Sequence, residues 1–474
     1  MWCAEWIANP FAGVCCKFNL GSDCMEKAVI SEMSRRTFLA SASAAAVVPL
    51  LGANQRQDLA MEGGKPVRST PLSTQFEGAN FIDDKEQAQV AQVLGSRNLF
   101  RFYGFTNPEI TRNFELDFAR FIGTKYALAV TSGTAALHVA LNALGVGPGD
   151  EVILPAWAWY SCYNAILLTG ALPVFAETNE SYTMDPDDLE KKITPQTKVV
   201  MPVHVFGSPV DMDSVLSIAR AHNFKVLEDS AESCGCLYKG RRTGSMGDIS
   251  IFSFQFQKMI TSGEGGAVVM NDPQLYERAI RFHDLGQVRP VFRGPLGLHD
   301  GEPGLVGLNY RMNEETGAIL GTQLTKIETM LASHRKKYQY LHARLSGLKG
   351  LKLRDSNDLE GEIGIALDII LPSKSLRDRF LKAMDAENVP MSIISASVVL
   401  PIMPYIATKQ APHPQWPSFN SPRGEAMRYG AECCPRTVDI WNRSATLSVG
   451  PKYGDDDLKD IVSAITKVHA ALLS

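Results

Sequence analysis

The chain has 474 residues, 45% of them hydrophobic and 21% charged, and carries a formal net charge of −4. A chain of this length suits two domains rather than one small core, and the composition is typical of a soluble globular protein. The slightly acidic balance gives no electrostatic reason to expect a nucleic-acid partner, and after residue 53 no apolar stretch approaches the length of a membrane span.

The N-terminal residues 1–53 are expected to be an extension that carries a targeting signal. From Met33 the sequence reads Met-Ser-Arg-Arg-Thr-Phe-Leu, followed by a Ser/Ala-rich apolar run that begins at Phe38. The paired Arg35 and Arg36 before this short segment resemble a twin-arginine export signal, and Met33 is a candidate true start. The pattern predicts an exported, periplasmic protein. The alternative is an Ala-rich tail without a signal, in a protein that stays cytoplasmic.

From about residue 115, short apolar runs alternate with amphipathic stretches. The apolar runs predict buried strands over residues 126–130, 151–154, 172–175, 198–203, 225–227, 249–254 and 267–270. The stretches between them predict helices over residues 135–144, 159–168, 187–192 and 212–222. Such alternation favours an α/β fold with a mainly parallel sheet flanked by helices, here in a large domain over residues 54–320.

After Asn313 the pattern changes. A long helical run to Leu345 predicts a bridge into a smaller C-terminal domain, residues 321–474. This domain is expected to contain a strand over residues 365–371, a helix over 376–388 and a final amphipathic helix over 455–472. The proline-rich segment 401–423 predicts a loop or linker.

The nine cysteines do not predict a disulfide framework, because four of them lie in the first 24 residues. The other five are an odd number, and those adjacent or one residue apart are poorly placed to bridge one another: Cys162, Cys234, Cys236, Cys433 and Cys434. No histidine cluster accompanies Cys234 and Cys236, so we expect buried thiols and no metal site.

The first candidate for a ligand site is the segment Ala129-Val-Thr-Ser-Gly-Thr-Ala-Ala-Leu137, in which an apolar strand leads through Ser132, Gly133 and Thr134 into a helix. Glycine lets the backbone approach a ligand closely, and the amides of a helix N-terminus attract anions, so the turn suits a phosphate group. A plain strand-to-helix turn with a capping residue is the alternative.

A second candidate is Asp229, which is expected at the carboxyl end of a buried strand, where open α/β sheets bind ligands. A carboxylate at this place can keep a pyridinium nitrogen protonated. A helix N-cap or a magnesium ligand are the alternatives.

The third candidate is Lys258, in the apolar and aromatic run Phe252-Ser-Phe-Gln-Phe-Gln-Lys. An unpaired buried ammonium is costly, and the neutral amine that burial favours can form an imine. Ser253 offers a hydroxyl to a phosphate, and the glycines at 263, 265 and 266 allow a tight return turn. The alternative is a lysine at a strand end with its ammonium in solvent.

Together these segments supply a phosphate cradle, a partner for a ring nitrogen and an imine-forming amine. In this respect the chain resembles the DegT/DnrJ/EryC1/StrS family of sugar aminotransferases, from about Gly63 to the C-terminus. The resemblance implies the aspartate-aminotransferase-like α/β fold, PLP fold type I, with pyridoxal 5'-phosphate (PLP) as cofactor. It also implies a homodimer and transfer of an amino group from glutamate or glutamine to a keto-sugar or cyclitol.

Residue roles follow from the resemblance. Lys258 corresponds to the Schiff-base lysine and Asp229 to the partner of the pyridinium nitrogen. The phosphate contacts correspond to Ser132, Gly133, Thr134 and Ser253. Trp159 corresponds to an aromatic residue that stacks on the cofactor, although a core position is the alternative. Asn309 corresponds to an asparagine that reaches the cofactor phosphate of the neighbouring subunit, which implies shared active sites.

Three further positions bear on the substrate. His204 matches a position near the substrate, and a hydrogen-bonded core histidine is the alternative. Glu232 stands where most members have Gln beside the cofactor's phenolic oxygen, and a carboxylate there would repel that oxygen unless protonated. Gln255 replaces a common His and is similar to branches that act on cyclitols or form aminohydroxybenzoate, whereas Glu232 is similar to sugar-converting branches.

Other classes of protein fit less well. The cluster Gly145-Val-Gly-Pro-Gly149 follows a helix and precedes a strand, which is the reverse of the order in a dinucleotide-binding site. A PLP-dependent dehydratase or lyase on the same scaffold, and a non-catalytic PLP-binding sensor, remain as alternatives to the transaminase.

Overall fold

The computed structural model describes residues 58–73, 81–102, 109–298 and 304–473. Every described residue belongs to one compact unit, Arg56–Ser474. The N-terminal extension with its twin-arginine motif lies outside the described residues, so the export signal stays a prediction. Among the helices in the described ranges, none combines the length and the apolar character needed to cross a membrane.

The centre of this unit is a seven-stranded sheet in which six strands run parallel. The exception is β9, which pairs antiparallel with β1 on one side and with β8 on the other. The prediction of a mainly parallel sheet is therefore confirmed. In pairing order the strands are β1 (Tyr126–Val130), β9 (Gly266–Met270), β8 (Ile249–Ser253), β5 (Lys225–Asp229), β4 (Thr197–Val200), β2 (Glu151–Pro155) and β3 (Leu172–Ala176).

Helices cover both faces of this sheet. They include α2 (Ile110–Ile122), α3 (Gly133–Ala143), α4 (Tyr160–Leu168), α5 (Pro186–Lys192), α6 (Met212–His222) and α7 (Pro273–His283). Successive side chains of a strand point to opposite faces. In β1, Leu128 and Val130 share a core with α3, α4 and α7, whereas Ala127 and Ala129 share a core with α2. The face of the sheet that packs against α2 continues over β2 to β5, where α5 and α6 cover it.

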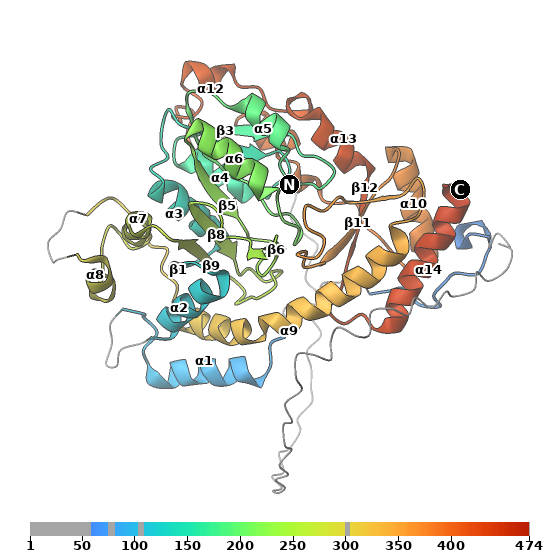
Figure 1. The fold of residues 1–474 in the computed structure, drawn as a ribbon, viewed down its shortest axis with the longest axis horizontal. Coiled ribbons are helices and arrows are strands. Elements are labelled where there is room, and N and C mark those ends of the chain that lie inside the picture. Colours follow the sequence, from blue (N-terminus) through green and yellow to red (C-terminus); the bar gives the residue numbers. More distant parts are fainter. Residues whose placement is uncertain (1–57, 74–80, 103–108, 299–303, 474) are drawn as a thin grey trace, which may run out of the picture. The chain divides into compact units, whose positions relative to one another are not determined.

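The 32-residue helix α9 (Glu314–Leu345) confirms the predicted long helix (Figure 1). It contacts α1 (Asp84–Ser96) and α2 beside the large sheet, and it also contacts the C-terminal helix α14 (Asp455–Leu472). The helix therefore links the large sheet to the C-terminal part of the chain.

That C-terminal part has an antiparallel sheet of its own. Its strands are β10 (Lys352–Leu353), β11 (Ala366–Ile370) and β12 (Ser444–Ser448), and α10 (Lys374–Ala386) packs with α14 into the same core. Leu59 and Leu72, from the N-terminal end of the described residues, are buried in this core as well. The boundary predicted near residue 320 falls within α9, and the division into two domains stays a prediction.

Two predicted elements differ from the structure. The strand predicted over residues 198–203 ends at Val200, because Pro202 has no N–H to continue the ladder, and only an isolated bridge joins Val203 to Asp229. The loop predicted over residues 401–423 was wrong in part, since it contains short helical turns with a proline in the first turn, where its missing N–H costs no bond. These turns are η3 (Leu400–Ile402), α11 (Pro404–Ala407) and the start of α12 (Pro422–Ala426).

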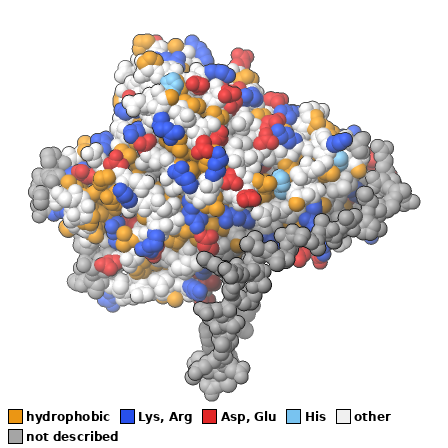
Figure 2. Space-filling view, in the orientation of Figure 1, with side chains coloured by type: hydrophobic (Ala, Val, Ile, Leu, Met, Phe, Trp, Pro, Cys, Tyr) orange, Lys and Arg blue, Asp and Glu red, His pale blue; other side chains and the backbone are white. Residues whose placement is uncertain are grey.

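The sequence patterns do not predict the remaining elements, which include α1, α2, α7, β10 and β12. The others are short: η1 (Ala60–Glu62), the hairpin of β6 (Leu237–Tyr238) and β7 (Arg241–Arg242), α8 (Pro290–Leu296), η2 (Ala396–Val398), η4 (Ala431–Cys433) and α13 (Pro435–Arg443). Figure 2 adds that, on the face in view, Lys and Arg side chains are interspersed with Asp and Glu side chains. That face does not present a field of one sign.

Candidate active site

Three of the predicted site residues lie at the carboxyl ends of strands that run in the same direction. Asp229 is the last residue of β5, Ser253 is the last residue of β8, and Ser132 follows β1 by two residues. Because parallel strands end at the same edge of a sheet, the three residues share one edge. This is the edge at which open α/β sheets bind ligands.

The predicted phosphate cradle is formed by the N-terminus of α3 packed against the end of β8. A Cβ atom placed on Gly133 would lie 2.7 Å from the Cβ atom of Ser253, so only glycine allows this approach. The Ser132 hydroxyl caps α3 by accepting a hydrogen bond from the Ala135 N–H at 3.0 Å, and the Thr134 hydroxyl donates to the Ser161 hydroxyl at 2.9 Å. The Ser132 side chain therefore serves as an N-cap, while the first-turn amides of α3 have no partner within the helix.

Asp229 is buried, with 4% of its surface exposed. Its Oδ1 accepts a hydrogen bond from the Ala231 N–H at 2.9 Å, and its Oδ2 accepts one from the Cys162 thiol at 3.0 Å. Burial raises the pKa of Asp229, and the hydrogen bonds and the charge of Lys258 offset this rise only in part. A carboxylate in this state is stabilised by an additional cationic donor.

Lys258 lies in the turn that follows β8. Its side chain is 21% exposed, and Nζ lies 3.8 Å from Oε1 of Glu232. The expectation of a buried lysine is therefore corrected in part: Phe252 and Phe254 are buried in the core, whereas Phe256 and Lys258 emerge from the end of the strand. The partial exposure gives the amine access to a ligand.

The turn closes through glycines, as expected from the sequence. Gly263 has a φ of +86°, which favours glycine, and its carbonyl accepts a hydrogen bond from the Phe256 N–H at 2.9 Å. The chain then returns along β9.

Glu232 faces Lys258 and is held by the backbone. Its Oε2 accepts a hydrogen bond from the Phe206 N–H at 3.1 Å, while Oε1 is the oxygen nearest the lysine amine. An N–H donor and a nearby ammonium both stabilise a carboxylate. The structure thus accommodates Glu at this position through a contact that the sequence patterns do not predict.

Trp159 precedes α4, and its side chain is 45% exposed. Its ring lies 4.3 Å from the ring of Tyr160, at an interplanar angle of 33°. This exposure does not fit the core alternative, and stacking on a cofactor stays a prediction.

His204 has the environment of a core histidine. Its ring is fully buried, Nδ1 accepts a hydrogen bond from the Val210 N–H at 3.0 Å, and Nε2 lies 3.1 Å from Oε2 of Glu228. Because Nδ1 is an acceptor, the ring proton lies on Nε2 and is donated to Glu228. Both nitrogens are engaged within the protein, so the ring offers no group to a substrate in this arrangement.

Gln255 and Asn309 lie close to the site in different ways. Gln255 Oε1 accepts a hydrogen bond from the Gln257 N–H at 2.8 Å, within the turn that carries Lys258. Asn309 is exposed, and the carbonyl of the next residue, Tyr310, accepts a hydrogen bond from the Thr131 N–H at 3.0 Å. The Asn309 segment therefore runs beside the Ser132 turn of its own chain, and its contact with a partner stays a prediction.

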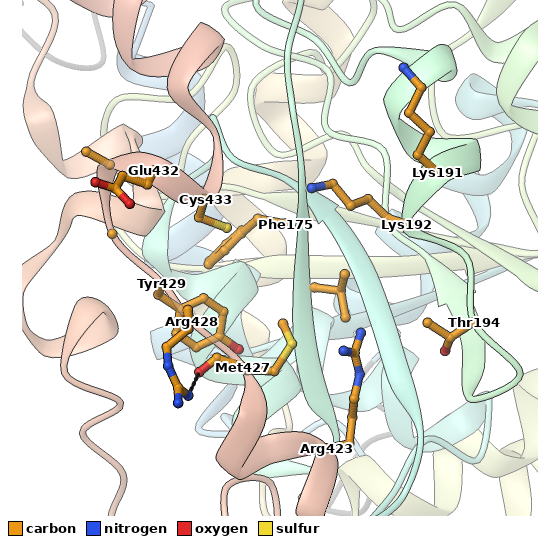
Figure 3. Close-up of a pocket in the computed structure, with 13 residues that line it drawn as sticks. Phe175, Lys191, Lys192, Thr194, Arg423, Met427, Arg428, Tyr429, Glu432 and Cys433 are labelled. Carbon is orange, nitrogen blue, oxygen red and sulfur yellow. Dashed lines mark hydrogen bonds between the residues drawn. The ribbon is translucent and has the colours of Figure 1, made fainter.

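A cavity of about 850 Å³ lies elsewhere, between β3, α5 and residues 423–433 (Figure 3). None of the predicted site residues lines it. Its cations do not converge: the ammonium of Lys191 points away from the other labelled side chains, and Arg423 pairs with the buried carboxylate of Glu151 at 2.7 Å. In the described part of the chain, no group of three His, Cys, Asp or Glu side chains is arranged to hold a metal ion.

Comparison with known proteins identifies the family. Residues 80–466 match the DegT/DnrJ/EryC1/StrS aminotransferase family. The chain belongs to this family. A GDP-perosamine synthase of Vibrio cholerae is 36% identical over 74% of this chain and 89% of its own length. One from Escherichia coli O157:H7 is 43% identical, over 48% of this chain and 60% of that relative, which is less than two thirds of its length.

A solved structure agrees with this assignment. The crystal structure of 3-amino-5-hydroxybenzoic acid synthase aligns at a TM-score of 0.69 and 26% identity, over 85% of this chain and 100% of that one. Together with the strand order, this confirms the predicted α/β fold, PLP fold type I. The chain is an enzyme of the aminotransferase class.

Proposed function

We propose that this enzyme uses PLP to transfer an amino group from glutamate or glutamine to the keto group of a sugar or cyclitol. The supporting observation is the arrangement at one edge of the large sheet. The Lys258 amine, the buried Asp229 carboxylate and the close contact of Gly133 with Ser253 come from three different segments. These three groups match an aldehyde, a ring nitrogen and a phosphate.

The residues present fit the cofactor. The N-terminus of α3 and Ser253 form a compact cradle for a phosphate, since no side chain separates Gly133 from β8. Asp229 is a buried carboxylate with a raised pKa, so a cationic ring N–H would be a favourable partner for it. When bound, PLP acts as an electron sink for the α-carbon of the amino donor.

The roles of the side chains follow from their positions. Lys258 would hold the cofactor aldehyde, and its released amine would then move the α-proton of the donor. Asp229 would keep a proton on the ring nitrogen. Glu232, held by the Phe206 N–H, would keep the lysine amine directed toward the reacting carbon. The exposed ring of Trp159 would pack against the cofactor and fix the plane in which the bond breaks.

The proposal for the acceptor rests on the relatives. Two of them are GDP-perosamine synthases, and the similar solved structure is a 3-amino-5-hydroxybenzoic acid synthase. These names favour a keto-sugar or a cyclic acceptor of similar size and polarity. A panel of keto-sugars and ketocyclitols, with mass spectrometry of the aminated products, would identify it.

The central test is the covalent link. Borohydride reduction of the PLP-loaded protein, followed by peptide mass spectrometry, is expected to label Lys258. Lys258→Ala should lose the label, whereas the exposed Lys239→Ala should keep it. Glutamate or glutamine should convert the wild-type spectrum from the aldehyde to the amine form of the cofactor. An unlabelled Lys258 would overturn the proposal. A label without amino transfer would indicate a sensor, and loss of water from a ketosugar would indicate a dehydratase.

We further propose a homodimer with shared active sites, in which Asn309 contributes to the partner's site. Lys258→Ala and Asn309→Ala should each be nearly inactive alone. If the residues act in the same site from different subunits, exchange of subunits creates one intact site per mixed dimer and restores about a quarter of wild-type activity. A monomer in light scattering, or no recovery after native mass spectrometry has shown mixed dimers, would contradict this.

Export by the twin-arginine signal is a separate proposal. Replacing both Arg35 and Arg36 by Lys should keep the protein in the cytoplasmic fraction, whereas Arg56→Lys, outside the motif, should not change its location. A wild-type protein found wholly in the cytoplasm at full length would contradict it.

A further inference from the structure

Asp229 has a partner that the proposed chemistry does not use. The thiol of Cys162, in α4, donates a hydrogen bond to Oδ2 of Asp229 at 3.0 Å, across 67 residues of sequence. Both side chains are buried. Of the five cysteines in the described residues, Cys162 is the one that bonds a carboxylate.

The thiol acts as a donor and not as a nucleophile. Burial raises the pKa of Cys162 well above its ordinary value, and the charges of Asp229 and Glu232 raise it further. The sulfur therefore keeps its proton over the working pH range, and thiolate chemistry is disfavoured. What it can offer to its neighbour is an S–H group.

The two donors to Asp229 act on different oxygens. The Ala231 N–H holds Oδ1, and the Cys162 thiol holds Oδ2, so the carboxylate plane is restrained from both sides. A thiol is a weaker donor than a hydroxyl or an amide. It can orient the carboxylate while removing little of the negative charge that a cationic ring nitrogen would need.

We infer that Cys162 is a positioning residue that aims the Asp229 carboxylate at the ring nitrogen of the cofactor while leaving its charge available. The role at the ring nitrogen rests on the proposed function, whereas the contact between thiol and carboxylate does not. The two parts are therefore tested separately.

The contact is tested in the protein without cofactor. The S–H stretching band lies in an infrared window free of other protein bands, and the band lost in Cys162→Ser belongs to Cys162. Because an amide oxygen is a weaker acceptor than a carboxylate, Asp229→Asn should shift this band to higher frequency. A band that does not move in Asp229→Asn would overturn the inference, whatever the cofactor does.

The role is tested with PLP labelled with ¹⁵N in the ring. In wild-type protein the ¹⁵N chemical shift should report a protonated nitrogen. Cys162→Ala should move the shift toward the unprotonated value and weaken PLP binding about 10-fold, because Asp229 loses a donor and its orientation. Cys162→Ser keeps a donor at the same place. Its ¹⁵N chemical shift should therefore stay near the wild-type value, and its affinity for PLP should stay within about 3-fold of wild type.

Cys234→Ala is the matched control, because Cys234 is also a fully buried cysteine but packs in the core beside α2 and α9 without a carboxylate partner. It should leave the ¹⁵N shift and PLP affinity unchanged. An equal loss in Cys234→Ala, or a wild-type shift and affinity in Cys162→Ala, would mean that Cys162 serves only packing. If Cys162→Ala does not fold, the infrared result and the properties of Cys162→Ser still test whether Cys162 positions Asp229. Failure of the borohydride label at Lys258 would instead count against the proposed function.

Discussion

Two buried carboxylates stand side by side on β5 and differ in how they are satisfied. Glu228 accepts hydrogen bonds from three backbone N–H groups, at Gly244, Met246 and Gly247, and from the ring of His204. Asp229 has two donors, of which one is a thiol. Neighbouring residues of a strand point to opposite faces, so the two acids lie in separate environments.

The difference appears in their pKa values. For Glu228, burial opposes ionisation, but the bonds from His204, Gly247 and Gly244 outweigh it and lower the pKa. For Asp229, burial prevails and raises the pKa. A buried charge with all its donors inside the protein supports the fold, whereas one with few donors is poised for an external cation. We therefore propose that the strand carries a structural acid, Glu228, followed by a functional acid, Asp229.

The largest expected effect is a loss of activity on changing Asp229, which should distinguish this residue from Glu228. Asp229→Asn should lower kcat/KM about 1,000-fold, since the amide cannot stabilise a cationic ring nitrogen. The stability of the cofactor-free protein should change little, because removal of the buried charge offsets the loss of one oxygen that accepts from Ala231 or Cys162. Steady-state kinetics and denaturant unfolding check both. If Asp229→Asn had a kcat/KM near that of wild type, Asp229 would have no functional role.

The converse variant is Glu228→Gln. Its amide presents N–H groups to backbone donors, so the free energy of unfolding should fall by about 3 kcal/mol. Activity per folded molecule should remain within a few-fold of wild type. Urea unfolding followed by circular dichroism measures the loss, and an unchanged midpoint would show that the network does not support the fold.

His204→Phe tests the same hydrogen-bond network by removing one partner of Glu228. It leaves the Val210 N–H without a partner and removes one of the two donors to Oε2 of Glu228, which should cost about 2 kcal/mol of stability. If His204 contacted the substrate instead, KM for the acceptor would rise while stability stayed near wild type. Measuring both in one variant distinguishes the two roles.

The smallest expected effect is a pair of opposite pH dependences of stability. The folded pKa of Glu228 is lowered, so its stabilising contribution is present above its unfolded pKa and is lost as pH falls through the folded pKa. The folded pKa of Asp229 is raised, so its charge destabilises the cofactor-free protein increasingly as pH rises above the unfolded value. The difference between wild type and Asp229→Asn should therefore grow toward neutral pH. If the stability of wild type and of Asp229→Asn changed with pH in parallel, the proposed difference between Asp229 and Glu228 would be contradicted.

Hydrophobic runs and local motifs predicted much of the molecule. The strand over residues 126–130 and the helix over residues 455–472 match β1 and α14. Lys258 and Asp229 stand out because a lysine in an aromatic run and an aspartate at the end of an apolar strand are unusual in local sequence. Short elements such as β6 and β7 give no periodic signal over two residues each.

By itself, the sequence determined the alternation of strands and helices and which residue types close the turn at Gly133, because both depend on neighbours along the chain. Only the tertiary structure decided that Glu228 has more hydrogen-bond donors than Asp229, that His204 belongs to the core, and that Lys258 is partly exposed. These outcomes depend on donors dozens of residues away, such as Cys162. The free energy of a buried charge is set by the groups that surround it in space, and those groups meet only when the chain has folded.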